Sequence, residues 1–143
     1  MSKFPAALAL LSLSFFSQAN ETSHPIDVTM KSCLDKAMAT ISIRDCYNQA
    51  HKAWDDELNK QYSLIMKTAG LNEEQKSALR NSQRAWLKYR DSYFDALQHY
   101  YPADGTIWGI IYDDQVMQIV RDKALSLESL RKSQCLSNSD ECE

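Results

Sequence analysis

The chain has 143 residues, of which 44% are hydrophobic, and a formal net charge of −3 at pH 7. This length suits one domain with a core of its own, and the acidic balance argues against nucleic acid as a partner, because nucleic-acid-binding proteins favour basic patches. A protein partner is expected instead, and an acidic body favours a cationic one through electrostatic steering, although solubility alone also accounts for this much negative charge.

The first 19 residues are typical of a secretory signal peptide. Lys3 supplies a positive charge, residues 5–16 form a short apolar stretch, and Ser17-Gln18-Ala19 places small residues at positions −3 and −1 of a cut before Asn20. A retained transmembrane anchor is the alternative, but it needs about 20 apolar residues and this run is shorter. The sequence therefore predicts a periplasmic or secreted protein with no membrane insertion after cleavage.

Four cysteines lie beyond this segment: Cys33, Cys46, Cys135 and Cys142. An even number in an exported chain indicates disulfides, with three pairings possible. Proximity in the sequence favours Cys33–Cys46 and Cys135–Cys142, each closing a short loop worth about 2–3 kcal/mol. Zinc binding is the competing interpretation, and it is disfavoured because neither pair is a CxxC and the three histidines lie far apart. No metal or other cofactor is expected.

Two helices are expected in the first half of the domain, after a polar lead-in at 20–26. The first spans about 27–39 and is weakened by the segment Thr40-Ile41-Ser42, where Ser42 can cap the helix that follows. The second spans about 43–69 and ends at Gly70, a good residue for the position after a helix. Its apolar residues recur at steps of three and four: Ile43, Tyr47, Ala50, Trp54, Leu58, Tyr62 and Ile65.

The third helix is expected to open with the capping box Asn72-Glu73-Glu74-Gln75, whose acidic residues meet the helix dipole, and to continue to about Tyr100. The segment Tyr101-Pro102-Ala103-Asp104-Gly105 is the clearest break in the chain. The apolar stripe expected on this helix consists of Leu79, Ser82, Trp86, Tyr89, Tyr93, Ala96 and Tyr100.

The fourth helix is expected at about 106–132, before a polar tail at 133–143 that Cys135–Cys142 would close. Its buried face consists of Ile110, Met117, Val120, Ala124 and Leu127. Asp113 falls one turn before Met117 on this face, and if it is buried it needs a donor, for which Arg90 or Tyr89 is a candidate. Four helices joined by short turns predict an all-α domain over 27–132: an antiparallel bundle of about four helices, stapled by disulfides.

The residues offer little enzyme chemistry. GxSxG, HExxH, a glycine-rich phosphate loop and a Cys–His nucleophile signature are all missing from the sequence. The acidic groups Asp55-Asp56-Glu57 and Asp113-Asp114 could in principle cleave a glycosidic bond, but neighbouring acids on a helix point in different directions. The pairs His51–Asp55 and Asp95–His99 match ordinary surface pairs four residues apart. We therefore expect a protein that is not an enzyme.

Two motifs carry a family resemblance. Residues 54–62 read W-D-D-E-L-N-K-Q-Y, and residues 79–91 read L-R-N-S-Q-R-A-W-L-K-Y-R-D. With Cys33 and Cys46 before them and Gly105-Thr106 after them, the chain resembles the LprI-like lysozyme-inhibitor domain family over about 33–130. The resemblance implies a secreted or periplasmic helical domain with an intrachain disulfide, and inhibition of lysozyme. The family commonly has a further cysteine pair where Phe94 and Asp113 stand here, so the sequence leaves open how the last helix is held.

The motif residues have a structural interpretation as well as a functional one. The aromatic and aliphatic members are expected in the core, and the polar members could form an interhelical network in which Arg90 engages a carboxylate in a fork. The motif residues in question are Trp54, Asp55, Glu57, Leu58, Asn59, Tyr62, Gln83, Arg84, Trp86, Arg90 and Asp91.

The resemblance and the composition together predict an exported binding protein that inhibits a lysozyme-type peptidoglycan muramidase. The candidate contact residues lie around the break between the third and fourth helices: His99, Tyr100, Tyr101 and Trp108. The alternative is an envelope protein-interaction or immunity-like module with a different partner. An enzyme acting on cell-wall glycan is the least favoured interpretation.

Overall fold

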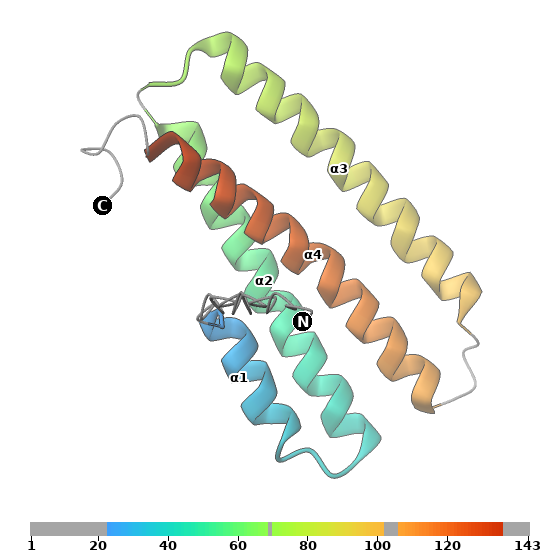
Figure 1. Cartoon of the computed structure of the whole chain (residues 1–143). Helices are drawn as coiled ribbons and strands as arrows, with labels where there is room; N and C mark the ends of the chain where they lie inside the picture. The colour runs from blue at the N-terminus through green and yellow to red at the C-terminus, as the bar shows by residue number, and fades with distance from the viewer. Residues whose placement is uncertain (1–22, 69, 102–105, 136–143) are drawn as a thin grey trace, which may run out of the picture.

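The structure, a computed structural model, describes residues 23–68, 70–101 and 106–135. It contains four helices, as the sequence predicts, and no strand occurs in these three stretches. Figure 1 shows how they are arranged. The helices are α1 (Pro25–Leu34), α2 (Thr40–Lys67), α3 (Glu73–Tyr100) and α4 (Thr106–Cys135). The all-α prediction is confirmed.

Helix α1 begins and ends earlier than expected. It starts at Pro25, where a proline costs nothing because the first helical N–H has no partner within the helix, and the Nδ1 atom of His24 accepts a hydrogen bond from the N–H of Ile26 at 3.2 Å. It ends at Leu34, and backbone bonds from the N–H of Lys36 and of Ala37 then close a tight turn.

Local hydrogen bonds also decide where α2 and α3 begin. The Oγ atom of Ser42 accepts from the Ala39 N–H at 3.2 Å and donates to the Ala39 carbonyl at 2.7 Å. Ser42 therefore lies inside the first turn of α2, whereas the sequence predicts it at the cap. The capping box of α3 is confirmed, because Asn72 and Gln75 exchange hydrogen bonds of 2.8 and 2.9 Å. Helix α2 ends at Lys67, two residues before the expected end.

Helix α4 continues to Cys135, three residues beyond its expected end, so the tail does not begin at residue 133. The predicted Cys135–Cys142 disulfide lies outside the described residues.

Consecutive helices run in opposite directions, yet the tightest packing joins α2 and α4, which run in the same direction (Figure 1). Two pairs of side chains show this. Arg44 near the start of α2 meets Asp113 near the start of α4, and Gln61 meets Arg131 towards the ends of both helices. The bundle is therefore built on a parallel pair, with α1 against α2 and α3 along α4.

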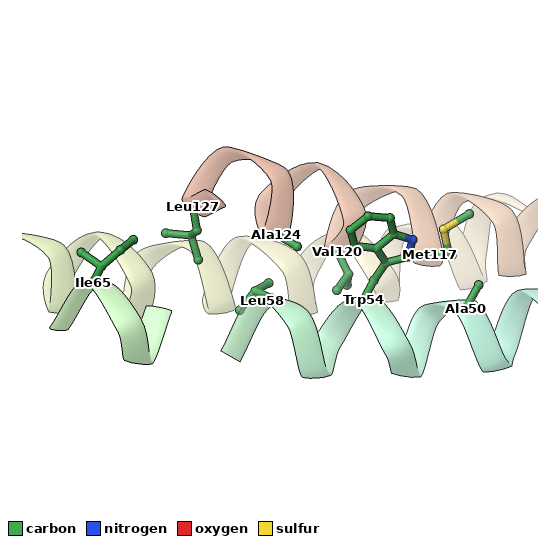
Figure 2. Close-up of a cluster of buried hydrophobic side chains, with 8 residues drawn as sticks. All are labelled: Ala50, Trp54, Leu58, Ile65, Met117, Val120, Ala124 and Leu127. Atoms are coloured by element: carbon green, nitrogen blue, oxygen red, sulfur yellow. The ribbon is translucent and has the colours of Figure 1, made fainter. Parts of the chain in front are cut away.

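The core between α2 and α4 confirms the stripes predicted for these two helices. Trp54, Met117 and Val120 are completely buried. The small side chains of Ala50 and Ala124 and the large indole of Trp54 belong to the same buried cluster (Figure 2). The buried cluster consists of Ala50, Trp54, Leu58, Ile65, Met117, Val120, Ala124 and Leu127.

The stripe predicted for α3 is only partly right: Leu79 and Trp86 pack against the core, but other members of the stripe face water. Tyr89 and Tyr100 are 57% and 78% exposed, and Ser82 is exposed too. The buried side chains of α3 are instead Gln83 and Leu97. Tyrosine has a polar end and tolerates water, so its spacing along a helix is a poor guide to the buried face.

Helix α1 is fastened to α2 by the Cys33–Cys46 disulfide, whose Cα atoms are 5.7 Å apart, and this confirms the predicted pairing. Ile26 and Met30 pack against the core from α1. None of the helices, as far as they are described, combines the length and the apolar character that crossing a membrane requires.

Candidate functional site

Trp54, the first residue of the α2 motif, lies at the centre of the core. The imidazole of His24 lies 4.4 Å from the indole ring, and the guanidinium carbon of Arg121 lies 5.4 Å from its centroid. The Nε1 atom of Trp54 has no hydrogen-bond partner among the described residues. Leu58 is 2% exposed, and Tyr62 and Trp86 pack partly buried against the same cluster. These motif residues hold the bundle together.

An ion pair next to Trp54 joins α1 to α4. Arg121 donates from Nη2 and Nε to Asp27, at 2.7 and 2.9 Å. The hydrogen bond to Asp27 raises the pKa of Arg121 above its ordinary value, so the guanidinium stays charged. The sequence gives no signal for this pair, because residues 94 positions apart share no local pattern.

The polar motif residues on α2 and α3 meet at one point. The Nη1 atom of Arg90 lies 3.9 Å from the Oδ1 atom of Asp55. Its Nε and Nη2 atoms instead donate to Asp91 on the same helix, at 2.9 and 2.7 Å, both to one oxygen. Asn59 donates to the carbonyl and to the carboxylate of Asp55 on α2. Arg90 also covers the rings of Trp86 and Phe94 at 5.5 and 5.8 Å, a cation–π arrangement.

Glu57 takes part in a different network, which joins α2 to α4. It accepts hydrogen bonds from Gln61 at 2.6 Å and from Lys60 at 3.1 Å. Gln61 in turn accepts from Arg131 at 2.8 Å. Burial alone would raise the pKa of Glu57, but the bonds from Gln61 and Lys60 outweigh it, and the pKa lies below its ordinary value. Glu57 is therefore an ionised structural group.

Two further motif residues lie on opposite sides of α3. Gln83 is 8% exposed, and its Oε1 atom has no hydrogen-bond partner among the described residues. Arg84 is exposed. The motif thus contributes to both the inner and the outer side of the helix.

Asp113 is buried, at 5% exposure, and its partner is neither of the two predicted residues. Arg44 donates to it from Nε at 2.6 Å and from Nη2 at 3.2 Å, and this raises the pKa of Arg44. The parallel packing of α2 on α4 explains the correction, since it brings the first two turns of the two helices together. Gly109 allows the approach: a Cβ there would lie 3.1 Å from the Arg44 guanidinium carbon.

His51 is a partly buried titratable side chain of α2. Burial lowers its pKa below the ordinary value, and its ring meets Phe94 edge-on at 6.1 Å. The nearby charges partly cancel, because Asp55 and Asp113 raise this pKa while Arg90 lowers it. Within the part of the chain that the structure describes, no three His, Cys, Asp or Glu side chains come together as metal ligands.

The four candidate contact residues gather at one end of the bundle. Tyr101 stacks on Trp108 at 5.8 Å and meets Tyr100 edge-on at 5.2 Å. The His99 side chain is 82% exposed and lies 3.7 Å from Asp95. These residues form an open aromatic surface. The residues of the connection between them, 102–105, lie outside the described part of the chain.

A groove of about 300 Å³ runs between α1 and α2 beside the disulfide. Its walls carry no ionisable side chain, so the groove lacks the groups needed for acid–base catalysis. Its lining consists of Pro25, Ile26, Thr29, Met30, Cys33, Cys46, Gln49, Ala50 and Ala53.

Several known proteins are similar to this chain. The sequence model of the family described as "Lysozyme inhibitor LprI" matches residues 20–127. An uncharacterized protein of Rhizobium meliloti (strain 1021) is 25% identical over 109 residues, which cover 68% of this chain and 78% of that protein. A crystal structure of an uncharacterized protein from Burkholderia thailandensis has a TM-score of 0.69 and 29% identity, over 75% of this chain and 53% of that chain. The chain thus spans about half the length of that structure.

Proposed function

Because the chain belongs to the LprI lysozyme-inhibitor family, we propose that it is an exported protein that binds lysozyme-type muramidases and inhibits them. The observation that carries the proposal is the family match across residues 20–127. The match begins where the sequence predicts the mature chain to begin after cleavage, and this supports export.

The arrangement of the ionisable groups favours binding over catalysis. Asp113 is held by Arg44, and Glu57 by Lys60 and Gln61, so these acids are occupied in structural contacts. A glycoside hydrolase needs two carboxylic groups facing one substrate bond across about 5–9 Å. The groove between α1 and α2 offers no such pair.

The binding surface includes the exposed aromatic end of α3 and α4. Tyr100, Tyr101 and Trp108 stand together there, with His99 beside them. Tyrosine and tryptophan are enriched at the centres of protein interfaces, because they offer a large contact area together with a polar end. The negative charge of the chain as a whole favours encounter with a cationic enzyme.

The test is an inhibition assay with the purified mature protein, residues 20–143, against lysozymes of several classes. Lysis of a peptidoglycan suspension and cleavage of a soluble oligosaccharide should both fall, and the concentration needed for half inhibition should follow the enzyme concentration. The dependence of half inhibition on the enzyme concentration separates binding to the enzyme from binding to the substrate. Full activity of every lysozyme class at micromolar excess of the protein would show the proposal to be wrong.

A further inference from the structure

Exposed apolar side chains gather at one end of the bundle. Five of the nine large hydrophobic residues that stand exposed in the described part of the chain lie there. A concentration of exposed apolar side chains at one end of a protein points to an interaction site. The five are Met38 (97% exposed), Ile41 (67%), Tyr100 (78%), Ile107 (57%) and Trp108 (40%).

The parallel packing of α2 and α4 brings these residues together. The Arg44–Asp113 pair joins the second turns of the two helices, and Ile41 precedes Arg44 by three residues. Ile107 and Trp108 precede Gly109, against which the Arg44 guanidinium lies. Figure 1 shows the starts of α2 and α4 side by side at this end. The turn between α1 and α2 therefore belongs to the same surface as the aromatic residues.

The α1–α2 turn is held rigidly by covalent and hydrogen bonds. The Cys33–Cys46 disulfide lies at its base, and the N–H of Lys36 donates to the Cys33 carbonyl at 3.1 Å. Ser42 closes the other side through its two bonds to Ala39. A turn that is ordered before binding loses less conformational entropy when a partner docks, so it suits a binding element.

Lys36 gives this end a free positive charge. It is exposed, and no ion pair with a carboxylate is recorded for it in the described stretches. Three other lysines in the described stretches, Lys67, Lys88 and Lys123, likewise form no ion pair, but they lie away from this end. Five more pair with a carboxylate on their own helix or turn: Lys31, Lys52, Lys60, Lys76 and Lys132. An unpaired ammonium group beside an apolar surface is complementary to a carboxylate in a partner's cleft.

We infer that the α1–α2 turn, with Lys36 and Met38, enters the saccharide cleft of the muramidase. Glycosidases of this kind flank the scissile bond with two carboxyl groups, and Lys36 binds there. Met38 fills an apolar sugar subsite with its adaptable side chain. Ile107 and Trp108 pack against the rim of the cleft. The inference rests on the proposed function and assigns the contact surface of this chain and the site on its partner.

The experiment compares charge variants at the two ends of α2 in the full mature protein. Lys36→Glu and Met38→Glu are expected to raise the inhibition constant at least tenfold, a loss typical of central interface residues. Lys67→Glu and Leu64→Glu make matching changes at the other end of α2, where both side chains are exposed, and should change it less than about twofold. Lys36→Arg should retain inhibition, because it keeps the charge.

The binding affinity for the enzyme is measured in parallel, with and without a saccharide that occupies the cleft. The saccharide should compete with the protein. Two results would overturn this inference and leave the proposed function standing. In the first, the wild type inhibits the enzyme and both Lys36→Glu and Met38→Glu inhibit it equally well. In the second, the saccharide does not change the binding affinity of the protein for the enzyme. A wild type that inhibits no lysozyme would overturn both the inference and the proposed function. If the protein alone forms a dimer and Met38→Glu dissociates it, this end of the bundle binds a second copy of the chain, and the inference is also overturned.

Discussion

The Arg44–Asp113 pair gives the sharpest test of how α4 is held. Asp113 is 5% exposed, whereas the Arg44 side chain is 41% exposed. Breaking a fully buried pair costs about 3–5 kcal/mol because one charge stays buried without a partner. Arg44→Met leaves Asp113 in that position, but water reaches the vacated place beside a half-exposed side chain, so we expect a loss of about 2–3 kcal/mol.

The opposite replacement should cost less. Asp113→Leu leaves Arg44 free to turn towards water, and we expect a loss of about 1 kcal/mol. The double variant should lie within about 1 kcal/mol of the wild type, because it leaves no buried charge unpaired. The cycle therefore predicts a coupling energy of at least about 2 kcal/mol between the two positions.

Urea unfolding of the four proteins, followed by far-ultraviolet circular dichroism, measures these free energies. Additive losses in the double variant would refute the reasoning, and so would an Arg44→Met variant as stable as the wild type. Either result would mean that the apolar cluster alone docks α4 on α2.

Three further predictions concern stability. Trp54→Ala removes a completely buried ring and should lower the free energy of unfolding by about 3–5 kcal/mol in urea titrations, while Trp86→Ala, at a partly buried site, should cost less. Replacing Cys33 and Cys46 together by serine should cost about 3 kcal/mol, measured in the same way. Burial lowers the pKa of His51 below 6.5, so the unfolded state binds more protons as the pH falls below 6.5 and stability decreases there. His51→Gln should flatten this part of the stability–pH curve, and an unchanged curve would contradict the assignment.

The faces of α2 and α4 could be read from the sequence because their buried residues are aliphatic or aromatic and recur with helical spacing. The cap of α3 could be read for a similar reason: Asn72 and Gln75 act through bonds within four residues. The buried face of α3 could not be predicted from the sequence. Helix α3 buries Gln83 and exposes Tyr89, and a side chain that is partly polar and partly apolar does not reveal by its spacing which side meets the core.

The sequence likewise predicts one part of the candidate site and gives no signal for the other part. His99, Tyr100, Tyr101 and Trp108 were predicted as a group because they surround one break in the chain. Met38 and Lys36 lie more than 60 residues earlier, and no local signal connects them to that break. The prediction that Arg90 or Tyr89 serves Asp113 failed because it assumed that α4 meets α3 there, whereas Asp113 meets α2 through Arg44.

The sequence by itself determined the number of helices, their approximate limits, the Cys33–Cys46 pairing and the family. Each of these depends on the periodicity, caps and short-range spacing of neighbouring residues. Only the tertiary structure decided that α2 and α4 pack in parallel, which side chains Arg44 and Arg131 meet, and which side chains share one end of the bundle. The physical reason is that such contacts join residues more than 60 positions apart, where the balance between burial and chain entropy across the whole fold selects the neighbours.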